Sequence, residues 1–138
     1  MNEIEIKKDW PPNIEEIRKV FTGDFKNVVF THGDTIYNPE GLPISQDLYV
    51  HESIHATQQR LHEGGPKEWW KKYLESPEFR LEQELQAYSA QYRVIKATST
   101  AKYTKSFLHR ITDDLSSDLY GKIVTYPKAE SLIRHRAK

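Results

Sequence analysis

His51-Glu52-Ser53-Ile54-His55 places two histidines four residues apart near the middle of the chain, with a glutamate directly after the first. On an α-helix, residues at this spacing lie one turn apart on the same face, so both imidazoles can bind one metal ion. Glu52 is displaced around the helix from that pair, where it can hold a water molecule without being a ligand. The motif therefore predicts a helical zinc site of the kind that hydrolyses bonds.

Composition limits how a metal could be held and which partners are plausible. The chain has 138 residues, no cysteine, 20 basic and 20 acidic side chains, and a formal net charge of zero. Without cysteine, disulfides and thiolate zinc sites are excluded, so zinc must be bound by histidine and carboxylate. A neutral chain offers no electrostatic footprint for nucleic acid or for an anionic membrane. The length predicts one domain, residues 1–138, large enough to bury a core.

Helix and turn signals around the motif predict a mainly helical α+β domain with a small N-terminal sheet. Asn13 is the expected cap of a first helix, and Ser45 that of the motif helix, which should run to about residue 62. The segments 27–31 and 35–37 should form a β-hairpin, and 42–44 a third short strand. Further helices are expected over the following segments: 67–74, 78–97, 103–115, and a short one after Tyr126-Pro127.

Within the motif helix, the apolar spacing predicts which face is buried. Four residues form the expected buried stripe: Val50, Ile54, Thr57 and Leu61. The two histidines lie on a different face, together with Leu48 and Gln59. A helix of this kind is expected to wall a cleft with its histidine face.

A third metal ligand is expected on the helix predicted for 78–97. Glu84 falls on the same face as a set of mostly apolar residues: Leu81, Tyr88, Gln91, Tyr92 and Ile95. Burying a carboxylate there is costly unless a cation pairs with it, and Ala87 leaves room for the motif helix to approach. His62 is one residue too late for the alternative that extends the motif with a third histidine. Asp118, close to Tyr120-Gly121, remains a weaker competitor for the third position.

The two segments together resemble the gluzincin branch of zinc metallopeptidases. His51-Glu52-Ser53-Ile54-His55-Ala56-Thr57-Gln58 and Glu84-Leu85-Gln86-Ala87-Tyr88 are similar to the HExxHxxQ and ExxAY helices of small single-domain metallopeptidases of phage and bacterial genomes. The resemblance covers residues 45–95 and implies a zincin-like fold with His51, His55 and Glu84 as zinc ligands. Many gluzincins carry an acidic residue soon after the third ligand, which this chain lacks. Support for the histidines should then come from Gln91, Asp47 or a backbone carbonyl.

These features predict a zinc peptidase that cleaves a peptide or protein substrate. A metal-activated water would attack the carbonyl carbon, with Glu52 as general base, and Tyr88 and Tyr92 are candidate donors to the carbonyl oxygen. The hairpin, or the strand near 42–44, could pair with an extended peptide. The alternative is a non-catalytic domain in which zinc stabilises the fold or a partner interface. A metal-free nucleic-acid or protein-binding module has little support in a chain of zero net charge.

The N-terminal residues show no basic segment followed by an apolar one, and no apolar run is long enough for a bilayer. We therefore expect a cytoplasmic protein without a membrane partner, acting in the host cytoplasm if a phage encodes it. Nothing in the sequence specifies an oligomeric state.

Overall fold

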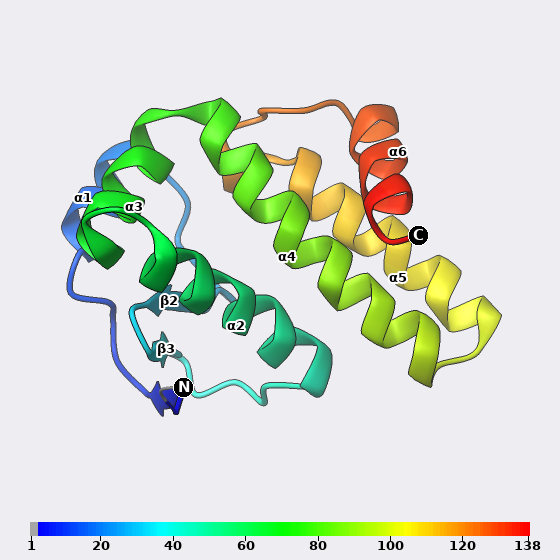
Figure 1. Cartoon of the computed structure of the whole chain (residues 1–138), viewed down its shortest axis with the longest axis horizontal. Helices are drawn as coiled ribbons and strands as arrows, with labels where there is room; N and C mark the ends of the chain where they lie inside the picture. The colour runs from blue at the N-terminus through cyan, green and yellow to red at the C-terminus, as the bar shows by residue number, and fades with distance from the viewer. Residues whose placement is uncertain (1–2) are drawn as a thin grey trace.

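The computed structural model describes residues 3–138 and has a mainly helical α+β fold (Figure 1). In chain order, the elements of this part are β1 (Glu5–Lys7), α1 (Ile14–Val20), β2 (Phe30–His32), β3 (Thr35–Tyr37), α2 (Gln46–Leu61), α3 (Gly65–Glu75), α4 (Pro77–Thr98), α5 (Ala101–Ser116), the 3-10 turn η1 (Asp118–Tyr120) and α6 (Tyr126–Arg136). None of these helices combines the length and the apolar character that crossing a bilayer would require.

The sheet has the strand order β1-β3-β2. The predicted hairpin is confirmed, because β2 and β3 are antiparallel with Thr31 opposite Ile36. The strand predicted at 42–44 is wrong. The Asn38 side chain accepts a hydrogen bond from the Leu42 N–H and donates one to the Leu42 carbonyl, so both backbone groups of Leu42 are used in a loop. The third strand is instead β1, which pairs parallel to β3 with Ile6 opposite Ile36.

Helix starts follow the sequence signals closely. Ser45 caps α2 by accepting a hydrogen bond from the Leu48 N–H, as predicted, and Ser76 caps α4 in the same way through Phe79. Helix α1 begins where Asn13 predicts, but the Asn13 side chain makes no cap hydrogen bond.

The buried face of α2 differs from the predicted apolar stripe. Leu61 is 75% exposed, Thr57 is exposed, and Val50 and Ile54 are only half-buried. The buried residues of α2 are mostly polar: His51, Glu52, His55, Ala56 and Gln59. These polar side chains can be buried because their neighbours supply hydrogen-bond partners. The amide of Gln59, for example, donates to the Thr31 carbonyl and accepts from the Gly33 N–H.

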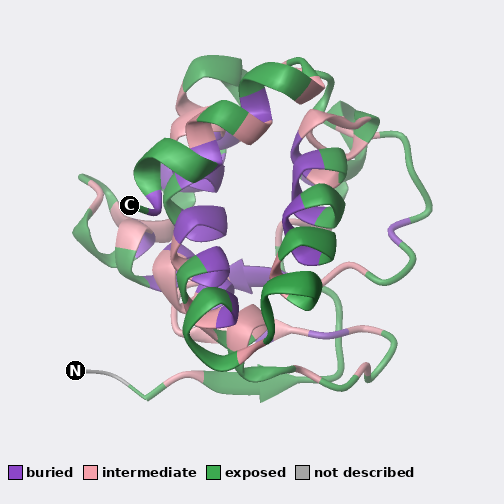
Figure 2. Ribbon diagram, turned by 90° about the vertical axis from the view of Figure 1, so that its right-hand side faces the viewer, coloured by how far each residue is buried: buried purple, intermediate pink, exposed green. Residues whose placement is uncertain are grey.

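Apolar residues gather in two separate clusters, and the buried sides of the helices face inward (Figure 2). The helical cluster joins α4, α5 and α6 through residues that include Tyr92, Ile111 and Ile133. The N-terminal cluster joins α1, α3 and the sheet region through residues that include Ile17 and Trp69. Helix α2 contributes to neither cluster and packs against α4, α3 and β2. The mainly polar buried face of α2 therefore lies between the helical cluster and the N-terminal cluster.

Candidate metal centre

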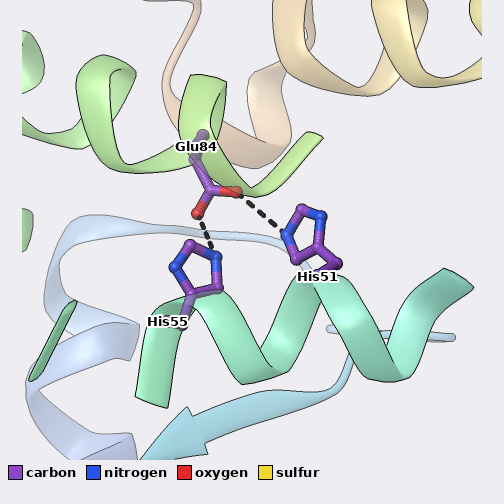
Figure 3. Close-up of side chains that lie close together, drawn as sticks. All are labelled: His51, His55 and Glu84. Carbon is purple, nitrogen blue, oxygen red and sulfur yellow. Dashed lines mark ion pairs between the residues drawn. The ribbon is translucent and has the colours of Figure 1, made fainter. Parts of the chain in front are cut away.

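His51, His55 and Glu84 converge on one point between α2 and α4 (Figure 3). The Nε2 atom of His51 lies 3.2 Å from Glu84 Oε1, and Nε2 of His55 lies 3.2 Å from Glu84 Oε2. Ligand atoms of all three residues lie within 4.8 Å of one another, and all three side chains are buried. The structure thus brings together the ligand set that the sequence predicts.

Close packing of α2 on α4 makes this approach possible. Ala87, one turn after Glu84, is completely buried, as expected for a small residue at the helix contact. Glu82 lies on another side of α4, where its carboxylate accepts two hydrogen bonds from the Arg136 guanidinium at 2.6 and 2.8 Å. Of these two carboxylates on α4, Glu82 belongs to a surface ion pair. Glu84 belongs to the group of three candidate ligands, His51, His55 and Glu84, which is called the metal cluster below.

The ring orientation of His51 is set by a glutamine rather than by a carboxylate. The Nδ1 atom of His51 lies 2.8 Å from Gln91 Oε1, and Gln91 Nε2 donates to Asp47 Oδ2 at 2.8 Å. A carboxylate oxygen can only accept, so the Gln91 amide must present its oxygen to His51. His51 therefore carries its proton on Nδ1, and its Nε2 lone pair faces Glu84. Both residues lie where the sequence predicts support for a histidine.

His55 has the same arrangement on the other side of the site. Its Nδ1 lies 2.9 Å from Gln58 Oε1, while Gln58 Nε2 donates to the Gln83 carbonyl and to Gln86 Oε1. The backbone carbonyl can only accept, so Gln58 also presents its oxygen to the imidazole. Two Nε2 lone pairs and one carboxylate thus face one another, an arrangement that requires a cation or protons.

The electrostatics of the three residues reflect this requirement. Burial alone lowers the pKa of His55, but the charge and hydrogen bond of Glu84, the charge of Glu52 and the hydrogen bond to Gln58 together outweigh that effect and raise the pKa to about 9. Burial alone raises the pKa of Glu84, but the two histidines hold it well below its usual range. Glu84 Oε1 is buried and accepts no hydrogen bond, although His51 Nε2 lies near. Two imidazole nitrogens and a carboxylate oxygen are a donor set that suits zinc.

Tyr73 is a residue of this site that the sequence did not reveal. Its hydroxyl, from α3, donates a 2.6 Å hydrogen bond to Glu84 Oε2. Burial and the charge of Glu84 raise the pKa of Tyr73 well above its ordinary value, so the hydroxyl keeps its proton. The ring of Tyr73 also stacks on Trp69, with centroids 4.9 Å apart. Tyr73 both packs and holds one oxygen of the predicted third ligand.

Glu52 lies beside the ligands without being one of them. The Thr31 hydroxyl donates a 2.8 Å hydrogen bond to Glu52 Oε1, and Glu52 Oε2 lies 3.8 Å from His51 Nε2. One carboxylate oxygen is therefore anchored to β2 while the other is directed toward the metal cluster. Thr31 was not singled out from the sequence, because no local pattern links it to a helix 21 residues later.

Two cavities flank the cluster and share residues that lie between them. A cavity of about 80 Å³ borders the three candidate ligands and Glu52, with aromatic walls that include Phe25 and Trp70. That volume accommodates only a few water molecules. A second cavity of about 470 Å³ borders Glu52 and His51 on the side of α5. The shared residues come from α2, from η1 and from the segment that precedes β2: Val28, Val29, His51, Glu52, Leu119 and Tyr120.

Four other residues were considered from the sequence as oxyanion donors or as a third ligand, and the structure brings one of them, Tyr88, to the site. Tyr88 lies at the site, with its ring centroid 4.5 Å from that of His51. Tyr92 packs in the helical cluster, under the ammonium of Lys96, and borders neither of the two cavities. Asp118 has an exposed side chain that pairs with Lys122, and the His62 ring packs on Phe79. The structure therefore does not bring Tyr92, Asp118 or His62 to the cluster.

The sheet edge nearest the cluster is partly covered. The Thr31 carbonyl of β2 accepts hydrogen bonds from Gln59 Nε2 and from the Trp70 indole N–H. That oxygen already accepts two hydrogen bonds, so it is not free to accept another from an extended peptide. This part of the hairpin therefore does not offer the pairing edge that the sequence predicted.

Removing either glutamine is expected to weaken zinc binding. Gln91→Leu or Gln58→Leu deletes the acceptor that holds the Nδ1 proton and lets the ring turn, so we expect the zinc dissociation constant to rise by about 10- to 100-fold. Competition with a fluorescent chelator measures this change. Gln46→Leu, at the exposed start of α2, is the matched control and should leave the constant unchanged. Unchanged affinity in both site variants would contradict the proposed orienting role.

Zinc affinity is expected to rise with pH up to about 9. In the metal-free chain the pKa of His55 is raised from 6.5 to about 9, so zinc must displace a proton at neutral pH. One displaced proton corresponds to about a tenfold gain in affinity per pH unit. The same proton stabilises the metal-free fold fully below pH 6.5, and this contribution is lost as pH rises through about 9. Zinc titrations at pH 6.5, 7.5 and 8.5 measure the expected rise in affinity, and melting curves of the metal-free protein measure the expected fall in stability. A zinc affinity that does not change with pH would contradict the first expectation.

Comparisons of this chain with protein-family models, with curated proteins and with solved structures found no match.

Proposed function

We propose that this chain is a zinc-dependent peptidase. The observation that carries the proposal is the convergence of His51, His55 and Glu84 beside a non-ligand carboxylate, Glu52, in a buried site. Both Nε2 lone pairs are directed inward by amide oxygens on the opposite side of each ring. That combination supports binding of a cation together with a general base, which a metal site with a purely structural role does not need.

A zinc ion held by these three residues would supply a Lewis acid and make a water molecule more acidic. Glu52 would take a proton from the attacking water and pass it to the amine that leaves. Thr31 restrains one oxygen of Glu52, so the other oxygen is presented in one orientation. Tyr73 would keep Glu84 in place through its hydrogen bond to Oε2. Peptides or proteins are the proposed substrates, because amide hydrolysis is the chemistry for which this set of groups is suited.

A second function is favoured by one observation, the deep burial of the candidate ligands. His51, His55 and Glu84 are 3–6% exposed, and the cavity that borders all three of them has a volume of about 80 Å³. Structural zinc sites are typically closed, whereas catalytic ones keep a position open for substrate. In this alternative the ion stabilises the fold or a partner interface without hydrolysis.

One experiment separates the two functions. The purified protein is stripped with a chelator, reloaded with one equivalent of zinc, and incubated with a mixture of quenched fluorescent peptides, while its melting temperature is recorded. Hydrolysis that disappears on stripping and returns on reloading supports the peptidase. A melting temperature that rises on reloading without any hydrolysis supports the structural alternative. Failure to retain zinc in either assay would reject both.

A further inference from the structure

Three tyrosine hydroxyls lie around the metal cluster, and they differ in what they bond. The Tyr73 hydroxyl is committed to Glu84 Oε2 at 2.6 Å. The hydroxyls of Tyr88 and Tyr120 lie 2.7 Å apart and are bonded to each other. Tyr88 belongs to α4 and borders only the larger cavity, whereas Tyr120 belongs to η1 and borders both cavities. Tyr120 is thus the tyrosine that both cavities share with His51 and Glu52.

A bonded pair of hydroxyls contains one donor and one acceptor. The accepting hydroxyl keeps its own proton free for a third group. If Tyr88 donates to the Tyr120 oxygen, the Tyr120 O–H is available to a substrate atom where the two cavities meet. Tyr88 is held by its edge-on contact with the His51 ring, so it is fixed relative to the metal cluster.

We propose that Tyr120 is the catalytic residue that donates a hydrogen bond to the carbonyl oxygen of the scissile peptide, with Tyr88 as the residue that positions it. The inference rests on the proposed peptidase function. No proton is transferred in this step: the Tyr120 O–H bond stays intact while negative charge develops on the carbonyl oxygen. Its proton is well retained, because burial and the charge of Glu84 raise the pKa of Tyr120 well above its ordinary value.

The backbone around Tyr120 restrains where its ring can lie. The Ser117 side chain caps η1 by accepting from the Leu119 N–H at 3.2 Å, and the Gly121 N–H donates to the Asp118 carbonyl at 3.0 Å. Gly121 then turns the chain away with a φ of +88°, a conformation that favours glycine. This short turn presents Tyr120 to the site from a segment outside the two motif helices, which explains why the motifs pointed to Tyr88 and Tyr92 instead.

The test compares Tyr120→Phe with Tyr103→Phe, an exposed tyrosine of α5, in zinc-loaded protein. For Tyr120→Phe we expect kcat to fall by about 100-fold with KM changed less than about threefold, because the hydrogen bond strengthens only as charge develops. Zinc content and melting temperature should remain close to those of Tyr103→Phe. Tyr88→Phe should show a smaller loss of kcat, since it keeps the Tyr120 hydroxyl but removes its partner.

A second readout does not depend on turnover. A peptide phosphonamidate carries anionic oxygens on a tetrahedral centre, and its dissociation constant can be measured by calorimetry. We expect binding to weaken by about 10- to 100-fold in Tyr120→Phe and to be unchanged in Tyr103→Phe. The same selective loss in a protein that hydrolyses no peptide would overturn the peptidase function while supporting the role of Tyr120 as a donor. Equal affinity in wild type and Tyr120→Phe, or no binding by either, would overturn the role of Tyr120.

Discussion

Glu52→Gln is expected to reduce peptide hydrolysis by roughly 10³-fold while zinc stays bound. The amide has nearly the same size and can still accept the hydrogen bond from Thr31, so the local structure should be retained. It cannot accept a proton from water at neutral pH, so the general base is lost. Because Glu52 is not part of the metal cluster, the zinc content should remain that of the wild type.

The measurement pairs initial rates with zinc per chain by mass spectrometry. Glu63→Gln, at an exposed position just after α2, is the matched control and should behave as wild type in both. Loss of zinc in Glu52→Gln would identify Glu52 as a ligand rather than a base. An unchanged rate would remove it from the reaction altogether.

Glu84→Gln is expected to raise the zinc dissociation constant by more than about 100-fold. Mutating a residue that only hydrogen-bonds to a metal ligand typically weakens metal binding by about 10- to 100-fold, and loss of a ligand should cost more. The substitution removes the single negative charge of the three candidate ligands, because the other two are neutral imidazoles when they bind zinc. It also removes the charge that raises the pKa of His55, so the metal-free variant should lose the pH dependence of stability between pH 6.5 and 9. Tyr73 can still donate to the amide oxygen, so packing at α3 should be preserved.

Glu82→Gln provides the control on the same helix, two residues earlier. Its carboxylate binds Arg136 at the surface and takes no part in the cluster, so this variant should keep wild-type zinc affinity. Chelator competition and the zinc-induced rise in melting temperature report the affinity of both variants. Similar zinc binding by Glu84→Gln and Glu82→Gln would show that the third ligand has been assigned wrongly.

The parts of the site that follow from the sequence are those set by helical spacing. His51 and His55 are one turn apart by sequence alone, and the cost of burying Glu84 among apolar residues predicted that a partner must lie opposite it. Thr31, Tyr73 and Tyr120 come from a strand, another helix and a short turn. Their approach depends on tertiary packing, for which no local pattern exists.

The errors in the fold have physical reasons as well. Strand β1 lies in a stretch, Glu3-Ile4-Glu5-Ile6-Lys7, that alternates polar and apolar residues, so its local signal was present and was missed. All three of its residues are exposed, and its parallel pairing with β3 joins segments about 30 residues apart, which no local pattern predicts. The apolar stripe predicted on α2 assumed that hydrophobic residues are buried first. Here the polar residues are buried, because hydrogen-bond partners from β2, from Gly33 in the turn after it and from α4 surround them, and Leu61 is left in solvent.

The position of α2 between two apolar clusters has a consequence for how the chain unfolds. The side-chain hydrogen bonds between α2 and α4 join polar groups, which water can replace once the helices separate. Apolar cohesion therefore holds each half together more strongly than it holds the halves to each other. A zinc ion bound by His51, His55 and Glu84 would span that junction and hold the two halves together more tightly.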